Sequence, residues 1–418
     1  MGEFSNVIGY TRIKGELLEI ADMIKNPEVY EALGARLPSG VLLEGAPGLG
    51  KTLLATEFIK VCGIRSFTLR RNKSGENFIG LLERTFDEAV REAPSIVFLD
   101  DMDKFAPDSR DSEEFVVLQA KIDEVKGKGV FIIATANDTD AIPYSLLRAG
   151  RFDRHISVSA PTGADSESII RHYLSDKPMD KDINYEDVAK MLYGKSCAEL
   201  ESVINSAAIA AAYGRASRIS IEHVMSAALR EAYGITEDCD ELSETEREET
   251  AYHEAGHALI SEVIDPGSVG LLSLSSSRRS EKGGFMLRCA DYTRRAYIIL
   301  VALGGKAASE IRFGKVASGT SSDIQKAISH LYRSVTAIGT CGLSAIGGGD
   351  ESEALDSRQE VIVEAELERN LFKAREIICD NREFLDALAR ELYEKKTLLY
   401  SDIKRIRDAC TIKPATVA

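Results

Sequence analysis

Short apolar runs alternate with amphipathic segments along the first part of the chain. Between Val41 and Ala160, five runs rich in β-branched residues are each followed by a turn or a helical pattern: VLLEG, SFTLR, IVFLD, VFIIATA and ISVSA. Runs of this length and composition are typical of strands buried on both faces of a parallel sheet. We therefore predict an α/β nucleotide-binding domain over residues 1–160, with helices on both faces of the sheet.

Beyond Pro161 the pattern predicts helices and no further strands. Four segments place apolar residues at helical spacing: SESIIRHYLS, YEDVAKML, AELESVINSAAIAAAY and SIEHVMSAALREAY. They predict a small helical subdomain over residues 161–235. The next segment, residues 236–249, is acidic and poor in apolar residues, as in a surface linker or the solvated start of a helix.

The rest of the chain, residues 250–418, is predicted to be a second, mainly helical domain. Its helical pattern is interrupted by LLSLSSSRRSEKGGF and IGGGDESEALDS. The longest apolar run, AYIILVALGG, is about half the length that crosses a bilayer, and the N-terminus MGEFSNVIGY lacks the pattern of a signal peptide. We therefore expect a soluble, cytoplasmic chain.

Composition narrows the function classes. The 418 residues include 67 acidic and 52 basic side chains, a formal net charge of −15, which argues against nucleic-acid binding as the main function. The seven cysteines are scattered without paired spacing, as in a protein that keeps its thiols reduced.

The first candidate site follows the first predicted strand. The stretch GAPGLGKT fits the pattern G-x-x-x-x-G-K-[ST], in which glycines let backbone N–H groups approach phosphates, the lysine contacts the β- and γ-phosphates and the threonine holds Mg²⁺. The pattern predicts an ATP site with Mg²⁺ formed by Gly45, Ala46, Pro47, Gly48, Leu49, Gly50, Lys51 and Thr52.

Polar residues that end later strands complete this site. IVFLDD delivers Asp100, expected to orient Mg²⁺, and Asp101, placed where a general base for the attacking water is needed. ATAND ends the next strand with Asn137, which could position the water. In LLRAGRFDR, either Arg148 or Arg151 could act as an arginine finger on a neighbouring subunit.

The second candidate site is the stretch TAYHEAGHALI. It contains His253, Glu254 and His257 in the pattern His-Glu-x-x-His, which on a helix places two imidazoles one turn apart on one face and the glutamate beside a metal-bound water. The pattern predicts a zinc site in which Glu254 is the catalytic base.

Two histidines leave the site without its third ligand. The metzincin pattern would require Gly and His where this chain has Ile260 and Val263. Spacing alone does not choose among the remaining candidates, and Asp323, at the start of a predicted helix, would on propensity be an N-cap or first-turn acid. These candidates are Glu262, Glu281, Glu310, Asp323 and His330.

The order GAPGLGKT, IVFLDD, ATAND, RAGRFDR resembles the AAA+ ATPase module, and LGARLPSGVLLEGAPGLGKTLLA is similar to the module of FtsH-type proteases. This resemblance covers about residues 6–234. It implies a ring homohexamer in which the arginines complete the site of the next protomer.

The stretch LGGKAASEIRFGKVASGTSSDIQKA looks like the protease domain of FtsH-type ATP-dependent zinc metalloproteases. The aspartate of the family's second motif is its third zinc ligand and matches Asp323, while Glu310 matches the acid of the first motif and is the second choice. The stretch AREIICDNREFLDALARELYEKKTL extends the resemblance to nearly the whole chain. The resemblance implies Zn²⁺, ATP and Mg²⁺ as cofactors and proteins as substrates.

The chain departs from the family at three places. Family members carry transmembrane helices before the AAA module, so this chain is either a soluble paralogue or has lost its anchor, in which case it belongs to the cytoplasmic face of a membrane. In IVFLDD, which corresponds to the Walker B motif, the second acid is Asp101, where the family usually has Glu. This difference predicts slow ATP hydrolysis. The pore-loop triplet would be Phe78, Ile79 and Gly80, with shortened spacing to the following helix, and a core position for Phe78 is the alternative.

The sequence thus predicts an ATP-dependent zinc endopeptidase whose hexameric ring unfolds substrates and feeds them to the zinc sites. Two alternatives remain. One is a non-proteolytic AAA+ remodelling ATPase or chaperone, and the other is a peptidase whose ATPase is weak because of Asp101.

Overall fold

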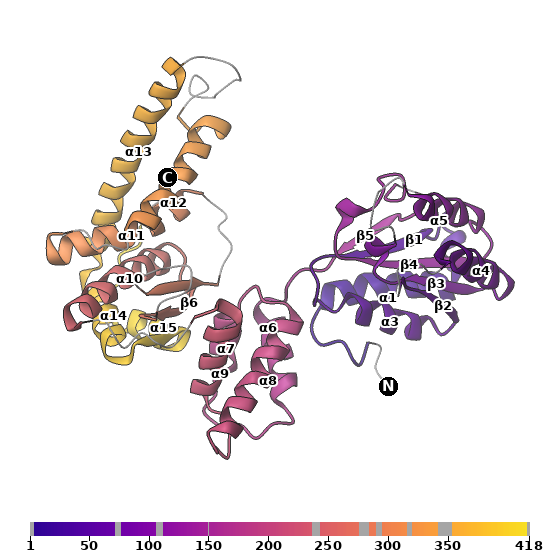
Figure 1. Ribbon diagram of the computed structural model, residues 1–418, viewed down its shortest axis with the longest axis horizontal. Coiled ribbons are helices and arrows are strands. Elements are labelled where there is room, and N and C mark those ends of the chain that lie inside the picture. The colour runs from indigo at the N-terminus through magenta and orange to yellow at the C-terminus, as the bar shows by residue number, and fades with distance from the viewer. Residues whose placement is uncertain are drawn as a thin grey trace. The chain divides into compact units, whose positions relative to one another are not determined.

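The computed structural model describes residues 4–71, 77–105, 112–148, 150–235, 243–275, 284–289, 295–315, 320–341 and 353–415. The chain divides into two units (Figure 1). The first comprises Met1–Asp176 and Gly194–Ser202, and the second comprises Lys177–Tyr193 and Val203–Ala418. Each unit buries hydrophobic residues of its own.

A five-stranded parallel sheet is the centre of the first unit. Its strand order is β2-β3-β4-β1-β5, and all neighbouring strands pair in parallel. The strands lie within three residues of the predicted runs, which confirms the expected α/β fold. Their bounds are β1 Gly40–Glu44, β2 Arg65–Leu69, β3 Ser95–Leu99, β4 Val130–Ala136 and β5 Arg154–Ser157.

Helices cover both faces of this sheet, because alternate strand residues point to opposite sides. Val41 and Leu43 of β1 pack with α1 (Thr11–Lys25) and α3 (Lys51–Cys62), whereas Leu42 packs with α4 (Phe78–Arg91) and α5 (Glu113–Glu124). The two hydrophobic clusters on either side of the sheet explain why these strands read as continuous apolar runs. The remaining elements assigned wholly to this unit are α2 Pro27–Glu31, η1 Met102–Lys104, η2 Thr139–Ala141 and α6 Gly163–Leu174.

The second unit is mainly helical, as predicted. Helix α10 packs against α11 and α14, and together with α12, α13 and α15 these helices bury one continuous hydrophobic cluster. Their bounds are α10 Glu244–Ile264, α11 Arg295–Phe313, α12 Thr320–Arg333, η4 Ser334–Ile338, α13 Glu353–Asp380, α14 Arg382–Lys395 and α15 Tyr400–Ala409.

A three-stranded antiparallel sheet in this unit was not predicted. It consists of β6 (Val269–Ser273), β7 (Phe285–Arg288) and β8 (Thr397–Leu399) in the order β7-β6-β8. The expectation that strands end at Pro161 is therefore wrong. Strand β6 is buried at every position and overlaps the start of the stretch that reads as a serine-rich interruption, while β8 is only three residues long and pairs across more than 120 residues of sequence. Local pattern carries no signal for such distant pairing.

The four helical segments predicted between residues 161 and 235 are present. After α6 come α7 (Tyr185–Met191), α8 (Cys197–Tyr213), α9 (Ile221–Ala227) and the π-helical turn η3 (Ala228–Ala232). Helix α6 groups with the first unit and α7 and α9 with the second, while α8 has residues in both. The predicted boundaries at residues 160, 235 and 249 stay predictions.

Part of the acidic segment is the start of a helix. Residues 236–242 lie outside the described ones, but Ser243 caps α10 and exchanges hydrogen bonds with Glu246 in a capping box. Residues 244–249 are thus the solvated first turns of the helix that carries the histidines. Among the described helices, none is both long enough and apolar enough to cross a membrane.

Candidate nucleotide and metal sites

The P-loop forms the turn between β1 and α3. Gly45 and Gly50 have φ angles of 146° and 85°, and a Cβ atom on Gly45 would lie 2.1 Å from the carbonyl oxygen of Val158. Only glycine fits such a position. Because α3 begins at Lys51, the N–H groups of its first turn have no carbonyl acceptor within the helix. They offer an anion-binding site. All eight residues of the predicted loop belong to this turn and to the first turn of α3.

Hydrogen bonds hold the Lys51 side chain against the backbone of the P-loop. Its Nζ atom donates to the carbonyl oxygens of Gly45 and Ala46 and to Oδ1 of Asn137, each at 2.7 Å. Burial lowers the pKa of the Lys51 ammonium group, and nearby aspartates, first among them Asp101, oppose that effect. These bonds use all three N–H donors of the ammonium group, so phosphate oxygens would bind Lys51 by replacing some of these partners.

Asp100 and Thr52 lie together at the carboxyl edge of the sheet. Oδ1 of the buried Asp100 accepts hydrogen bonds from the hydroxyl groups of Thr52 and Thr135, both at 2.9 Å. A hydroxyl and a carboxylate at this edge are the oxygen ligands that Mg²⁺ uses in P-loop enzymes. The structure thus brings together the two residues that the sequence assigned to magnesium.

Asp101 follows in a left-handed conformation, with φ of 56°. Its N–H donates to the Thr135 hydroxyl at 2.9 Å, and Asn137 Nδ2 donates to its Oδ1 at 3.3 Å. Burial raises the pKa of the Asp101 carboxyl, but Lys104 and Arg70 outweigh burial and the net shift is downward. The predicted base and the predicted water-positioning amide therefore lie in contact, with basic side chains beside them.

The two candidate arginine fingers differ in their surroundings. Arg151 pairs with the carboxylate of Asp123 through Nε at 3.1 Å and Nη2 at 2.7 Å, and also contacts the Ser145 carbonyl oxygen. Arg148 is exposed, with its guanidinium 5.3 Å from the ring centroid of Tyr144. Arg148 is therefore the arginine whose charge can reach another molecule, and Arg151 holds the loop that presents it.

Phe78 occupies a core position. It is the first residue of α4, only 2% exposed, and its ring lies 4.8 Å from that of Phe105 in an edge-to-face arrangement. The triplet Phe78, Ile79 and Gly80 forms the first turn of a helix capped by the Asn77 side chain. The expected pore-loop role of this triplet is corrected accordingly, because a buried ring cannot grip a substrate in a channel.

Helix α10 carries the His-Glu-x-x-His pattern deep inside the second unit. The rings of His253 and His257 lie 4.7 Å apart at 87°, and both histidines and Glu254 are buried. A Cβ atom on Gly256 would lie 2.4 Å from the carbonyl oxygen of Gly304 in α11. The glycine lets the two helices approach closely at the level of the histidines.

The backbone of α11 sets the tautomer of His257. Its Nδ1 atom lies 2.6 Å from the carbonyl oxygen of Val301. A carbonyl oxygen can only accept, so Nδ1 carries a proton, and in the neutral imidazole Nε2 is the nitrogen whose lone pair can bind a metal ion. This is the arrangement that orients metal-binding histidines.

Asp323 completes a group of three ligand atoms. Its Oδ2 lies 3.2 Å from Nε2 of His253 and 3.2 Å from Nε2 of His257, and these nitrogens are 3.2 Å from each other. The three side chains form a group that can hold a metal ion, and the only such group found among the described residues. Separations of 3.2 Å between the three ligand atoms are compatible with a zinc ion bound at ordinary distances of ~2.0–2.1 Å.

Gly305 in α11 makes room for the two imidazoles. A Cβ atom on this residue would lie 2.5 Å from both His253 Cε1 and His257 Nε2. Any side chain here would press on the imidazoles. The donor set and the tautomer of His257 fit a zinc ion.

Charges in this group stabilise one another. Burial lowers the pKa of His257, but the Asp323 carboxylate outweighs burial and raises it to about 9. Burial raises the pKa of Asp323, yet hydrogen bonds from His253 and His257 hold it far below its usual range. Burial raises the pKa of the Glu254 carboxyl, and the imidazoles offset only part of that rise. Glu254 is therefore suited to take up a proton.

The other candidate third ligands lie elsewhere or are engaged. Glu310 accepts from Arg375 at 2.6 Å and contacts Lys306, and the buried Glu262 accepts from Arg407 at 2.7 Å. His330 lies two helical turns beyond Asp323 on α12, roughly 10 Å along the axis. Glu281 lies outside the described residues.

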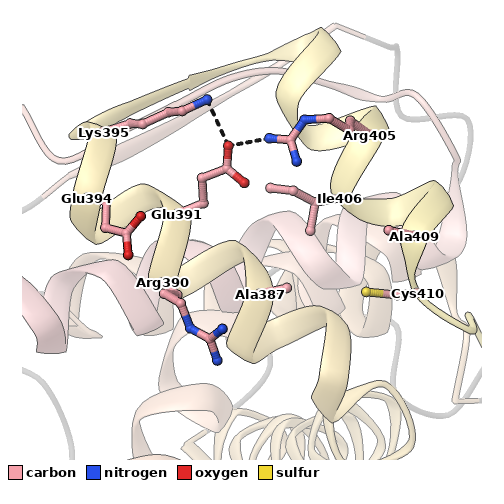
Figure 2. Close-up of a pocket in the computed structure, with 9 residues that line it drawn as sticks. All are labelled: Ala387, Arg390, Glu391, Glu394, Lys395, Arg405, Ile406, Ala409 and Cys410. Atoms are coloured by element: carbon pink, nitrogen blue, oxygen red, sulfur yellow. Dashed lines mark hydrogen bonds and ion pairs between the residues drawn. The ribbon is translucent and has the colours of Figure 1, made fainter.

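A surface pocket of about 300 Å³ lies between α14 and α15, apart from the predicted site residues (Figure 2). Across it, Glu391 pairs with Lys395 at 2.8 Å and with Arg405. The pair with Arg405 joins the two helices, whereas Glu391 and Lys395 both belong to α14. The pocket is lined by Ala387, Arg390, Glu391, Glu394, Lys395, Arg405, Ile406, Ala409 and Cys410.

Comparison with known proteins agrees with both sites. Residues 41–160 match the ATPase family associated with various cellular activities (AAA), and residues 240–406 match peptidase family M41. The chain is 33% identical to the ATP-dependent zinc metalloprotease FtsH 2 of Symbiobacterium thermophilum, over 97% of this chain and 74% of that protein. The chain belongs to the FtsH family. Membership implies Zn²⁺, ATP and Mg²⁺ as cofactors, and the nucleotide and metal sites fall within the two matched segments.

Two further relatives carry the name ATP-dependent zinc metalloprotease FtsH. The chain is 31% identical to the protein of Bacillus subtilis, over 98% of this chain and 70% of that protein. It is 31% identical to the protein of Ureaplasma parvum, over 99% of this chain and 62% of that protein. The chain thus spans about two thirds of the length of the relatives it matches.

Sequence reasoning missed three contributors to these sites. The Val301 carbonyl leaves no trace in residue type, whereas Gly305 lies in the GG pair of a helix, where glycine is costly and therefore a signal of close approach. Arg70, which contacts both Asp100 and Asp101, stands directly after a predicted strand, at the sheet edge where ligands bind.

Proposed function

We propose that this chain is an ATP-dependent zinc endopeptidase that acts on protein substrates. The observation that carries the proposal is the convergence of His253, His257 and Asp323, each ligand atom 3.2 Å from the other two, beside the buried Glu254. The same chain holds a P-loop whose threonine contacts Asp100 and whose lysine contacts Asn137, which in turn contacts Asp101. Two sites with these chemistries in one FtsH family chain support coupling of ATP hydrolysis to proteolysis.

In this proposal His253, His257 and Asp323 hold the zinc ion. Bound zinc would polarise the scissile carbonyl group and make water a better nucleophile. Glu254 takes the proton from the attacking water and passes it to the leaving amine. Burial raises the pKa of Glu254 and so favours the protonated carboxyl that exists between these two transfers. The Val301 carbonyl keeps the proton of His257 on Nδ1, so Nε2 stays available as a ligand.

At the nucleotide site, Lys51 binds the β- and γ-phosphates, and Thr52 with Asp100 holds Mg²⁺. Asp101 acts as the base for the attacking water, which Asn137 helps to position. An aspartate reaches one methylene less far than a glutamate, and a misplacement of about 1 Å can cost up to ~10²-fold in rate. Slow ATP hydrolysis is therefore part of the proposal.

The assembly proposed is a homohexameric ring. The exposed Arg148 would contact the ATP of the neighbouring protomer, while Arg151, paired with Asp123, supports its loop. The ring would unfold protein substrates and pass them to the zinc sites. Because Phe78 is buried, the grip on the substrate would have to come from other residues than this triplet.

One set of assays tests the proposal against both alternatives. Degradation of a folded and of an unfolded protein is measured with ATP, without ATP and with a zinc chelator, in the wild type and in Glu254→Gln. We expect ATP-dependent cleavage of the folded protein that both the chelator and Glu254→Gln abolish.

Other outcomes contradict it. ATP hydrolysis without cleavage under any condition would identify a remodelling ATPase. Cleavage of the unfolded protein regardless of ATP, combined with almost no ATP hydrolysis, would identify a peptidase with a weak ATPase.

A further inference from the structure

Arg70 stands at the edge of the sheet where nucleotide is expected. It directly follows β2, and Leu69 and Leu99 are paired, so Arg70 and Asp100 leave adjacent strands at the same level. Arg70 Nη1 lies 3.6 Å from Asp100 Oδ2, and Nη2 lies 3.2 Å from Asp101 Oδ2. The arginine side chain is 55% exposed, whereas the two aspartate side chains are 5% and 15% exposed. The guanidinium therefore covers both acids from the solvent side.

A chain of polar contacts links Arg70 to the lysine of the P-loop. Lys51 donates to Asn137 at 2.7 Å, Asn137 donates to Asp101 at 3.3 Å, and Arg70 contacts Asp101 at 3.2 Å. Lys51 is the residue that binds the β- and γ-phosphates in this type of loop. Arg70 thus lies at the far end of a short series of contacts that begins at the expected γ-phosphate.

A second series of contacts reaches Arg70 from Thr52 and Asp100, the residues expected to hold Mg²⁺. Thr52 donates to Asp100 at 2.9 Å, and the other carboxylate oxygen of Asp100 lies 3.6 Å from Arg70. The two series of contacts start from the neighbouring P-loop residues Lys51 and Thr52 and meet at the guanidinium group of Arg70.

We propose that Arg70 recognises the γ-phosphate of ATP and thereby lets the site distinguish ATP from ADP. An arginine has five N–H donors in a fixed fork, so it can contact a phosphate oxygen and keep a carboxylate partner at the same time. In this role Arg70 bridges the γ-phosphate and Asp101 and holds the base beside the phosphorus that the water attacks. The inference rests on the proposed ATPase function and adds to it a positioning residue on the same protomer.

Nucleotide affinities test this role without relying on catalysis. Dissociation constants of Mg-ADP and of the Mg complex of the β,γ-imido analogue of ATP are measured by calorimetry for the wild type, Arg70→Gln and Arg70→Lys. The matched control is Arg65→Gln, since Arg65 stands at the opposite end of β2 and pairs with Glu92 at 3.4 Å on the surface. Thermal unfolding of each variant shows that it is folded.

Loss of charge-assisted hydrogen bonds to one phosphate should weaken binding of the ATP analogue about tenfold in Arg70→Gln and leave ADP binding within about twofold. Arg70→Lys should fall between, and Arg65→Gln should match the wild type. Equal weakening of both nucleotides, or of neither, would show that Arg70 only neutralises the aspartates and would overturn the inference. If the wild type binds neither nucleotide, the proposed ATPase function fails together with the inference.

Discussion

Two carboxylates within 14 residues of each other show how a single residue's surroundings decide its role. Asp323 lies with its Oδ2 atom 3.2 Å from two imidazole nitrogens, while Glu310 is held by Arg375 and Lys306. A carboxylate already paired with two cations is a poor metal ligand, because binding would leave those cations without partners. The geometry therefore favours Asp323 as the third zinc ligand.

Zinc content separates these two carboxylates. We expect Asp323→Ala to weaken zinc binding by at least about 100-fold, because the loss of a direct ligand should exceed the 10- to 100-fold loss seen for outer-shell partners. Bound zinc after dialysis against a weak chelator, measured by atomic absorption, checks this. Glu310→Ala is the control and should keep about one zinc per protomer. Zinc retained by Asp323→Ala but lost by Glu310→Ala would reverse the assignment.

At the scale of elements, α11 connects the metal site to the rest of its unit. It supplies the carbonyl of Val301 to His257 and approaches α10 so closely that Gly304 and Gly256 are in backbone contact. One and a half turns further on, Glu310 ties α11 to α13 through Arg375. Packing on both sides thus keeps α11 in the position that the histidines require.

The link between α11 and α13 should depend on pH. Burial raises the pKa of Glu310, but Lys306 and Arg375 outweigh burial and lower it below its ordinary value of 4.5. The ionised form is therefore favoured in the folded state, so its contribution is present above pH 4.5 and is lost as the pH falls through the lowered pKa. We expect Glu310→Gln to lower the free energy of unfolding by about 1 kcal/mol at pH ~7.

Urea unfolding of metal-free wild type and Glu310→Gln at several pH values checks this. The difference between the two proteins should shrink as the solution becomes more acidic than pH 4.5. A difference that stays constant into acid would show that the ion pair contributes nothing and that the substitution acts through packing.

At the scale of the whole molecule, the ATP site lies in one unit and the metal site in the other. Each has its own core, so each can be altered without dismantling its neighbour. In the proposed hexamer, the ATP site of one protomer also needs the exposed Arg148 of the next. ATP hydrolysis at each interface should therefore require an intact ATP site on one protomer and an intact Arg148 on the next.

Mixing two inactive variants tests this dependence. Lys51→Ala removes ATP binding, and Arg148→Ala, whose side chain is exposed, should fold normally yet lose at least about 100-fold in ATP hydrolysis. A mixture of the two should regain part of the activity, because some interfaces then pair an intact ATP site with an intact arginine. The measurement is the steady-state ATPase rate across mixing ratios. A rate that never exceeds the sum of the separate variants would exclude Arg148 as a finger in trans.

The sequence alone determined the features that depend on local pattern. Buried β-branched runs predicted the parallel sheet, and the P-loop and the His-Glu-x-x-His helix were evident because their residues are neighbours along the chain. The site residues Thr52, Asp100, Asp101 and Asn137 could be grouped in advance, since parallel strands end at one edge of a sheet.

Only the tertiary structure decided what depends on distant contacts. It placed Asp323 against histidines 66 and 70 residues away, buried Phe78, paired β8 with β6, and brought Arg70 to the two aspartates that follow β3. Residue type and spacing alone do not select these contacts, because the free energy that selects them comes from packing between segments far apart in the sequence.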